Sequence, residues 1–330
     1  MKYRTQLIPY MKSYDGQFAD SGEIRWLPYL MYFHPCNYTS DVVNTDTLGF
    51  RYSECTSEKK HSVSDTTGGS VRLIAGSSTV FGIGASSDGS TLASCLNRND
   101  IRQEPWLNFG GRSFNSTQEV IQLILNKHRL TNVEEIVVFS GFNDLGLAKM
   151  PDHLKSDGGA FFNCEPFYDL KNKNKSKLQA LKYWITGGDD TSCESLSLPE
   201  QMDAAANQTL QNLLIWKLVA DHFNAKLTYV LQPLANWVRS SGSVEEENLF
   251  AELDELGDFT SIYGDILTPK VCEQYGLKLQ KGCEDLKVEF INMAPIIAES
   301  VTELDWIFVD RIHFTDHGHN LVSKLILENL

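Results

Sequence analysis

The chain has 330 residues, of which 42% are hydrophobic and 22% charged, enough apolar material for one large domain or two small ones. Its 43 acidic and 29 basic residues give a formal net charge of −14. Such a charge disfavours a nucleic-acid backbone or an anionic membrane surface as the main partner. No stretch approaches the ~20 apolar residues of a membrane helix, and the N-terminal residues lack the apolar run of a signal peptide. We therefore expect a cytoplasmic protein.

Residues 1–70 are rich in aromatic and turn-forming residues and show little periodicity. We expect them to form an irregular arm packed on the core, ending in the polar, Gly/Ser-rich stretch "SEKKHSVSDTTGGS". The remaining residues, 71–330, are predicted to form one domain.

In this second part, strand and helix patterns alternate. Short apolar runs predict strands at 70–76, 106–111, 134–141, 225–233 and 287–293. Apolar residues at helical spacing predict helices at 90–99, 117–129, 199–224 and 316–330. This alternation indicates a parallel sheet covered by helices on both faces. Residues 146–198 break the rhythm and are too long for an ordinary connection, so we expect an insertion or a lid there.

Chemically useful side chains follow several of the expected strands. In open parallel sheets, ligands bind at the carboxyl ends of the strands. Those ends supply serines in "AGSSTVFG", backbone amides in "NFGGRSFNS", an asparagine in "SGFNDL" and an Asp–His pair in "VDRIHF". A nucleophile, oxyanion donors, a base and a group that orients the base are the parts needed for acyl transfer.

The stretch "FVDRIHFTDHGHN" carries three histidines and two aspartates, and a metal site is the alternative interpretation of it. His313 and His317 could converge on a metal only if one helix carried both. Thr315 or Asp316 is predicted to start a helix after His313, which breaks that geometry. We therefore expect no metal site and no cofactor.

The blocks "AGSSTVFG", "SGFNDL" and "VDRIHF" resemble motifs of the SGNH (GDSL-type) hydrolases, and the resemblance covers the chain from about Ser70 to the C-terminus. The resemblance implies that Ser78 is the nucleophile, Asn143 an oxyanion donor, Asp310 the orienting acid and His313 the base. It also implies a flavodoxin-like α/β fold, a three-layer α/β/α sandwich with a five-stranded parallel sheet. "NTDTLGFR" is similar to a segment of a bacterial subgroup often associated with surface-glycan genes.

The chain departs from the family pattern at two positions. Ser77 stands where the family usually has Asp or Gly, which leaves Ser77 as an alternative nucleophile, although aligning Gly76 with the family's Gly favours Ser78. Ser113 stands where the second block usually has Gly. A backbone N–H serves there whatever the side chain, so the oxyanion hole is expected to use the N–H groups of Ser78 and of Ser113 or Gly111, with the Asn143 amide.

The resemblance implies a serine esterase that hydrolyses an acyl ester, expected to be an acetyl ester, through an acyl-serine intermediate. The expected partner is a small-molecule or glycan ester, with a carbohydrate favoured as the bearer. One alternative is an O-acyltransferase that uses the same triad and hands the acyl group to a sugar hydroxyl. Another is a non-catalytic glycan-binding protein on the same frame. The sequence does not indicate the oligomeric state.

Overall fold

A central sheet of five parallel strands organises the chain. The computed structural model describes residues 2–17, 25–56, 59–66, 69–102, 104–150, 155–156, 159–162, 196–255 and 259–330. The strands of the sheet are β5 (Ser70–Gly76), β6 (Trp106–Gly110), β7 (Asn132–Ser140), β10 (Lys226–Leu231) and β11 (Glu289–Asn292). Their spatial order is β11-β10-β7-β5-β6, so all five expected strands are confirmed.

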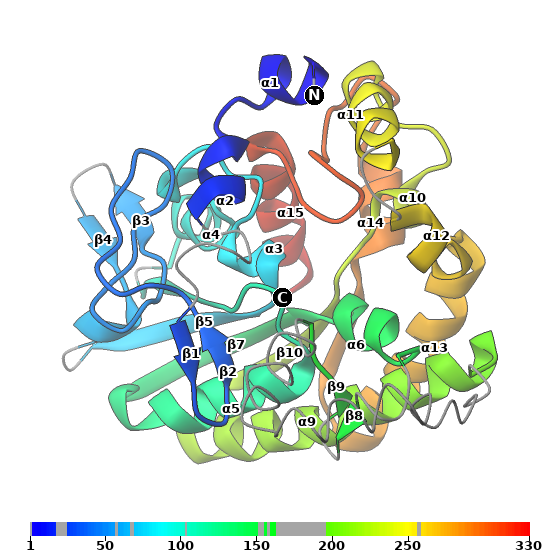
Figure 1. Cartoon of the computed structure of the whole chain (residues 1–330). Helices are drawn as coiled ribbons and strands as arrows, with labels where there is room; N and C mark the ends of the chain where they lie inside the picture. The colour runs from blue at the N-terminus through cyan, green and yellow to red at the C-terminus, as the bar shows by residue number, and fades with distance from the viewer. Residues whose placement is uncertain are drawn as a thin grey trace, which may run out of the picture.

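Helices cover both faces of the sheet (Figure 1), which confirms the expected three-layer α/β/α sandwich. The layer below the sheet in Figure 1 contains α5 (Ser116–Asn126) and α9 (Leu198–Phe223), and α13 (Pro269–Leu286) packs against α9. The layer above it contains α4 (Leu92–Asn99) and α15 (Asp316–Asn329), which contact each other. Since both faces are covered, the central strands are mainly apolar and most of their side chains are buried.

Shorter elements connect these layers. The helices are α3 (Ser78–Phe81), α6 (Phe142–Leu147), α10 (Ala235–Val238), α11 (Val244–Asp254), α12 (Phe259–Tyr263) and α14 (Met293–Ser300). The 3-10 turns are η1 (Val63–Asp65), η2 (Asp88–Ser90), η3 (Lys127–Arg129) and η5 (Gly264–Ile266), and one small hairpin pairs β8 (Lys155–Ser156) with β9 (Gly159–Ala160). The insertion predicted for 146–198 lies largely outside the described residues. No helix in the described ranges is both long and apolar enough to cross a membrane.

The N-terminal segment, which the sequence predicts to be irregular, contains several short elements. These are α1 (Lys2–Leu7), α2 (Met11–Gln17), a hairpin of β1 (Arg25–Leu27) and β2 (Met31–Phe33), and a hairpin of β3 (Ser53–Thr56) and β4 (Lys59–His61). Each is at most seven residues long. Such lengths give too few repeats for a period to be recognised in the sequence.

A buried arginine joins this segment to the sandwich. The Arg51 guanidinium is fully buried and pairs with Asp88 at 2.7 Å. It also donates to the carbonyl oxygens of Phe81 (3.2 Å) and Gly82 (2.9 Å), at the end of α3. A buried charge is tolerated when it is paired and hydrogen-bonded in this way. The N-terminal segment is thus part of the packed structure next to α3.

Candidate active site

The turn between β5 and α3 brings a serine to the carboxyl edge of the sheet. Gly76 ends the strand with φ +156°, and a Cβ there would lie 2.1 Å from the carbonyl oxygen of Phe139, so only glycine fits. Ser77 is the residue before α3, and its hydroxyl faces Gln232 at 3.3 Å. Ser78 is the first residue of α3, and its Oγ lies 2.8 Å from Nε2 of His313. The structure therefore places Ser78, and not Ser77, against the histidine.

The histidine and its carboxylate come from one short loop. Asp310 Oδ2 lies 2.7 Å from His313 Nδ1, and Oδ1 accepts the backbone N–H groups of Ile312 and His313, both at 2.8 Å. The loop is closed at its base, where the Val309 N–H donates to the His313 carbonyl. The three-residue spacing thus lets one carboxylate hold both the backbone and the ring of the histidine.

Electrostatics fix the proton arrangement in this loop. Burial opposes ionisation of Asp310, but the charge and hydrogen bonds of His313, with the two backbone donors, outweigh it and lower the pKa of the carboxyl group. An ionised carboxylate only accepts, so Nδ1 of His313 carries the ring hydrogen. Nε2 is then free to accept the hydroxyl proton of Ser78.

Two backbone N–H groups without an acceptor among the described residues, and one side-chain amide with a hydrogen to spare, lie in the segments that follow β5, β6 and β7. The Ser78 N–H is at the first position of α3, where no intrahelical acceptor exists. The Ser113 N–H donates to no described residue. Asn143 uses Nδ2 to donate to the Phe114 carbonyl at 2.6 Å, which leaves its second amide hydrogen for another acceptor.

The Gly111 N–H, the alternative to Ser113, is already engaged. It donates to the carbonyl oxygen of Gly76 at 2.9 Å, so it is not available to an oxyanion. Ser113 has φ +59°, a left-handed conformation that favours glycine. A glycine would adopt this conformation without strain, whereas the serine needs support from its surroundings.

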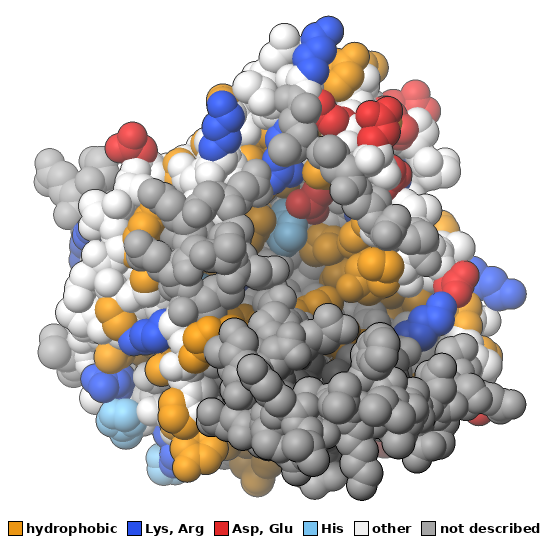
Figure 2. All heavy atoms as spheres, in the orientation of Figure 1, with side chains coloured by type: hydrophobic (Ala, Val, Ile, Leu, Met, Phe, Trp, Pro, Cys, Tyr) orange, Lys and Arg blue, Asp and Glu red, His pale blue; other side chains and the backbone are white. Residues whose placement is uncertain are grey.

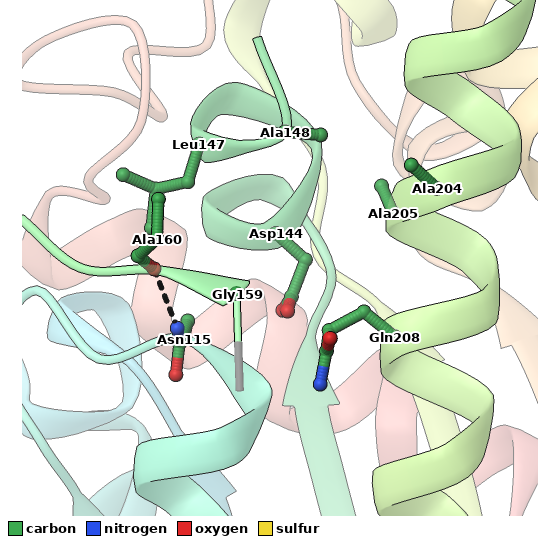
Figure 3. A pocket seen from close by; sticks show the side chains of 9 residues that line it. All are labelled: Asn115, Asp144, Leu147, Ala148, Gly159, Ala160, Ala204, Ala205 and Gln208. Carbon is green, nitrogen blue, oxygen red and sulfur yellow. Dashed lines mark hydrogen bonds between the residues drawn. The ribbon is translucent and has the colours of Figure 1, made fainter. Parts of the chain in front are cut away.

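Buried acids lie behind this loop. Asp144 accepts from the N–H (3.0 Å) and hydroxyl (2.8 Å) of Ser116, at the start of α5. Burial raises the pKa of Asp144 to about 6. Glu119 accepts from the Ser140 hydroxyl at 2.8 Å, and burial followed by the charge of Asp144 raises its pKa well above the usual value. Asp144 also lines a cavity of about 200 Å³ between α6, β9 and α9 (Figure 3).

A second cavity adjoins the Asp310 loop. Its volume is about 200 Å³, and its lining residues are Phe250, Leu253, Asp254, Phe259, Asp310, Arg311 and Ile312. The face shown in Figure 2 is hollowed near its middle, where a histidine is exposed beside acidic and hydrophobic side chains. The lining of this second cavity is mostly apolar, which suits an uncharged group of a ligand.

The residues of the histidine-rich stretch after His313 have partners other than Ser78, or no hydrogen-bond partner, among the described residues. Thr315 caps α15 by accepting the Gly318 N–H at 3.0 Å, so the predicted helix start is confirmed. His317 is more than half exposed and lies 3.7 Å from Asp305. His319 is fully buried, and burial lowers its pKa to about 3. In the part of the chain that the structure describes, no group of three His, Cys, Asp or Glu residues is placed to hold a metal ion.

Two contacts from the N-terminal segment were not predicted from the sequence. The Tyr32 hydroxyl donates to the Ser113 carbonyl at 2.9 Å, and His34 Nε2 lies 3.1 Å from the Arg112 N–H. Both side chains are nearly fully buried. No motif marks them, because they reach the loop only through the packing of β2 against it.

No family model and no curated protein matches the chain. Among solved structures, it is similar to a member of the lipolytic protein G-D-S-L family from Veillonella parvula, with 13% identity and a TM-score of 0.41, over 79% of this chain and 97% of that one. An acetyl xylan esterase gives 12% identity and a TM-score of 0.38, over 78% of this chain and 98% of that one.

A two-domain esterase active on acetylated mannans gives 10% identity and a TM-score of 0.40, over 78% of this chain and 48% of that one. The solved structures similar to this chain thus include esterases and a G-D-S-L family protein.

Proposed function

We propose that the chain is an SGNH-type serine hydrolase that cleaves an acyl ester through Ser78, His313 and Asp310. The proposal is supported by two consecutive hydrogen bonds. One joins Ser78 Oγ to His313 Nε2 at 2.8 Å, and the other joins His313 Nδ1 to Asp310 Oδ2 at 2.7 Å. A serine hydroxyl becomes a useful nucleophile only when a base accepts its proton, and this contact supplies the base.

In the first half of the proposed reaction, Ser78 Oγ attacks the ester carbonyl carbon while its proton moves to Nε2 of His313. Asp310 holds the ring and stabilises the imidazolium. The carbonyl oxygen becomes an oxyanion that accepts hydrogen bonds from the Ser78 and Ser113 N–H groups and the Asn143 amide. The tetrahedral intermediate collapses, and His313 gives its proton to the departing alcohol.

In the second half, water replaces the alcohol. His313 takes a proton from the water molecule, whose oxygen attacks the acyl-serine carbonyl. Collapse of this second tetrahedral intermediate breaks the bond to Ser78 Oγ, which recovers a proton from His313. The products are a carboxylic acid and free enzyme, so no cofactor is consumed.

A fluorophosphonate probe tests this proposal, because it reacts covalently with an activated serine. We expect the wild type and Ser77→Ala to be labelled and Ser78→Ala to remain unlabelled. The wild type and Ser77→Ala should also hydrolyse p-nitrophenyl acetate, whereas Ser78→Ala should not. Labelling that persists in Ser78→Ala but disappears in Ser77→Ala would assign the nucleophile to Ser77.

We propose an acetyl ester of a carbohydrate as the substrate class. The support is the similarity of "NTDTLGFR" to the subgroup associated with surface glycans. Acetate release from acetylated oligosaccharides, compared with hydrolysis of p-nitrophenyl butyrate and octanoate, tests it. Faster hydrolysis of the octanoate than of any acetyl ester would contradict the acetyl assignment.

A further inference from the structure

The segment Gly111–Phe114, here called the oxyanion loop, is held from outside the motif-bearing region. Tyr32 and His34, at the end of the β1–β2 hairpin, contact it at two consecutive residues. The Tyr32 hydroxyl donates to the Ser113 carbonyl (2.9 Å), and the Arg112 N–H faces His34 Nε2 (3.1 Å). The two contacts bracket the peptide bond that carries the Ser113 N–H.

The hydrogen bonds of His34 define its tautomer. Its Nδ1 lies 3.1 Å from the Gly49 carbonyl, which can only accept, so Nδ1 carries the hydrogen and Nε2 accepts from Arg112. Burial, together with the nearby charge of Arg112, lowers the pKa of His34 well below its usual value. The ring is therefore neutral near pH 7, as the Arg112 contact requires.

The same ring also touches the helix of the nucleophile. The His34 and Phe81 rings are 3.9 Å apart between centroids, and Phe81 is the last residue of α3, which Ser78 begins. His34 thus contacts both the oxyanion loop and the helix that presents the nucleophile.

The loop needs support because Ser113 adopts a left-handed conformation without being glycine. Glycine adopts this region readily, Asn and Asp adopt it less often, and other residues rarely do. The surrounding structure must therefore stabilise it at Ser113. The Ser113 carbonyl is held by Tyr32, whereas the Ser113 N–H donates to no described residue. The arrangement fixes the peptide and leaves its donor available.

We propose that Tyr32 and His34 are positioning residues for the oxyanion hole, holding the Arg112–Ser113 peptide in the left-handed turn that directs the Ser113 N–H toward the ester oxygen. This inference rests on the proposed function. It predicts that the two side chains affect the transition state more than substrate binding, because the negative charge on oxygen develops only there.

The test measures kcat and KM for p-nitrophenyl acetate in Tyr32→Phe, with and without Ser113→Gly. We expect Tyr32→Phe to lower kcat about tenfold and change KM less than about twofold, a smaller loss than removal of a donor would give. In the Ser113→Gly background the loss should fall below about threefold, since glycine adopts the left-handed turn without a Cβ penalty.

Tyr10→Phe is the matched control, because Tyr10 belongs to the same N-terminal segment and its hydroxyl donates to a carbonyl outside the loop, that of Gly84 (3.0 Å). It should keep kcat within about twofold of the wild type. An equal loss in Tyr10→Phe and Tyr32→Phe, or the same Tyr32→Phe loss with and without Ser113→Gly, would overturn the inference.

A second pair of variants decides the case if Tyr32→Phe does not fold, as judged by thermal unfolding. His34→Gln keeps an acceptor for the Arg112 N–H, whereas His34→Leu does not, so His34→Gln should retain the higher kcat. Equal kcat values would count against the positioning role. An inactive wild type that the fluorophosphonate probe does not label would refute the proposed function itself, whereas an active wild type with full activity in Tyr32→Phe would refute only this inference.

Discussion

Two loops meet at the candidate active site, and they are supported in different ways. The loop from Val309 to Phe314 contains its own support, because Asp310 binds the ring of His313 and two backbone N–H groups within three residues. The oxyanion loop instead depends on β2, on the end of β5 and on Asn143. A locally supported loop leaves a readable spacing in the sequence, whereas a loop held by distant segments does not.

The largest loss of activity is expected when the carboxylate of the Val309–Phe314 loop is replaced by an amide. Asp310→Asn keeps an oxygen for the Ile312 and His313 N–H groups but would place an amide donor against Nδ1 of His313. The ring would then carry its hydrogen on Nε2, where it cannot accept from Ser78, and we expect kcat to fall by about 10⁴. Steady-state kinetics check this, with a thermal unfolding curve to show that the fold is intact. Retention of more than about a tenth of the activity would contradict the assigned role.

A smaller loss of kcat is expected when Asn143, one of the side chains that hold the oxyanion loop, is replaced. Asn143→Ala removes the proposed oxyanion donor and the 2.6 Å contact to the Phe114 carbonyl. We expect kcat to fall by about 10² with little change in KM, because the donor acts on the transition state. The same kinetics measure it. A rise in KM at constant kcat would show that Asn143 binds the ground state instead.

The buried acids Glu119 and Asp144 should make the stability of the fold depend on pH. The pKa of Glu119 is raised in the folded chain by burial and by Asp144, so its contribution to stability is present below its unfolded pKa, about 4.5, and is lost as the pH rises through the folded value. Asp144, with a pKa of about 6, acts in the same direction at lower pH. Glu119→Gln removes one of these ionisations.

We therefore expect Glu119→Gln to unfold at a higher temperature than the wild type at pH 9, by a margin that shrinks toward pH 5. Differential scanning fluorimetry across this range measures the difference. The exposed Glu255→Gln serves as the control and should give curves parallel to the wild type. Parallel curves for Glu119→Gln as well would contradict the assigned ionisation.

The smallest expected effect concerns the backbone of the oxyanion loop. Ser113 has φ +59°, and Ser113→Gly relieves a left-handed conformation that costs a serine about 1 kcal/mol. The greater freedom of glycine in the unfolded chain offsets part of this gain. We expect a rise of no more than about 1 kcal/mol in the free energy of unfolding, measured by urea titration. A clear loss of stability would mean that the serine side chain makes contacts that outweigh the strain.

The same contrast explains what the sequence revealed. The strands of the sheet are buried on both faces, so their apolar runs were recognisable, and the spacing of Asp310 and His313 indicated their contact. The left-handed turn at Ser113 leaves no signal in the sequence, because serine rarely adopts that conformation. Tyr32 and His34 could not be identified at all, since their role depends on a pairing across about 80 positions of sequence. The sequence left open whether the Ser113 or the Gly111 N–H faces the oxyanion. The hydrogen bond from the Gly111 N–H to the Gly76 carbonyl, which favours Ser113, is visible only in the structure.

The buried Arg51 has a consequence for where this chain can be divided. A shortened chain that began at Ser70 would keep every motif residue, yet Asp88 would lose its counter-ion and the carbonyl groups of Phe81 and Gly82 would lose a donor. Removing one partner of a buried ion pair typically costs about 3–5 kcal/mol, a large share of the stability of an ordinary domain. We therefore expect the cooperative folding unit to extend beyond the motifs into the N-terminal segment, and shortened variants should retain Arg51.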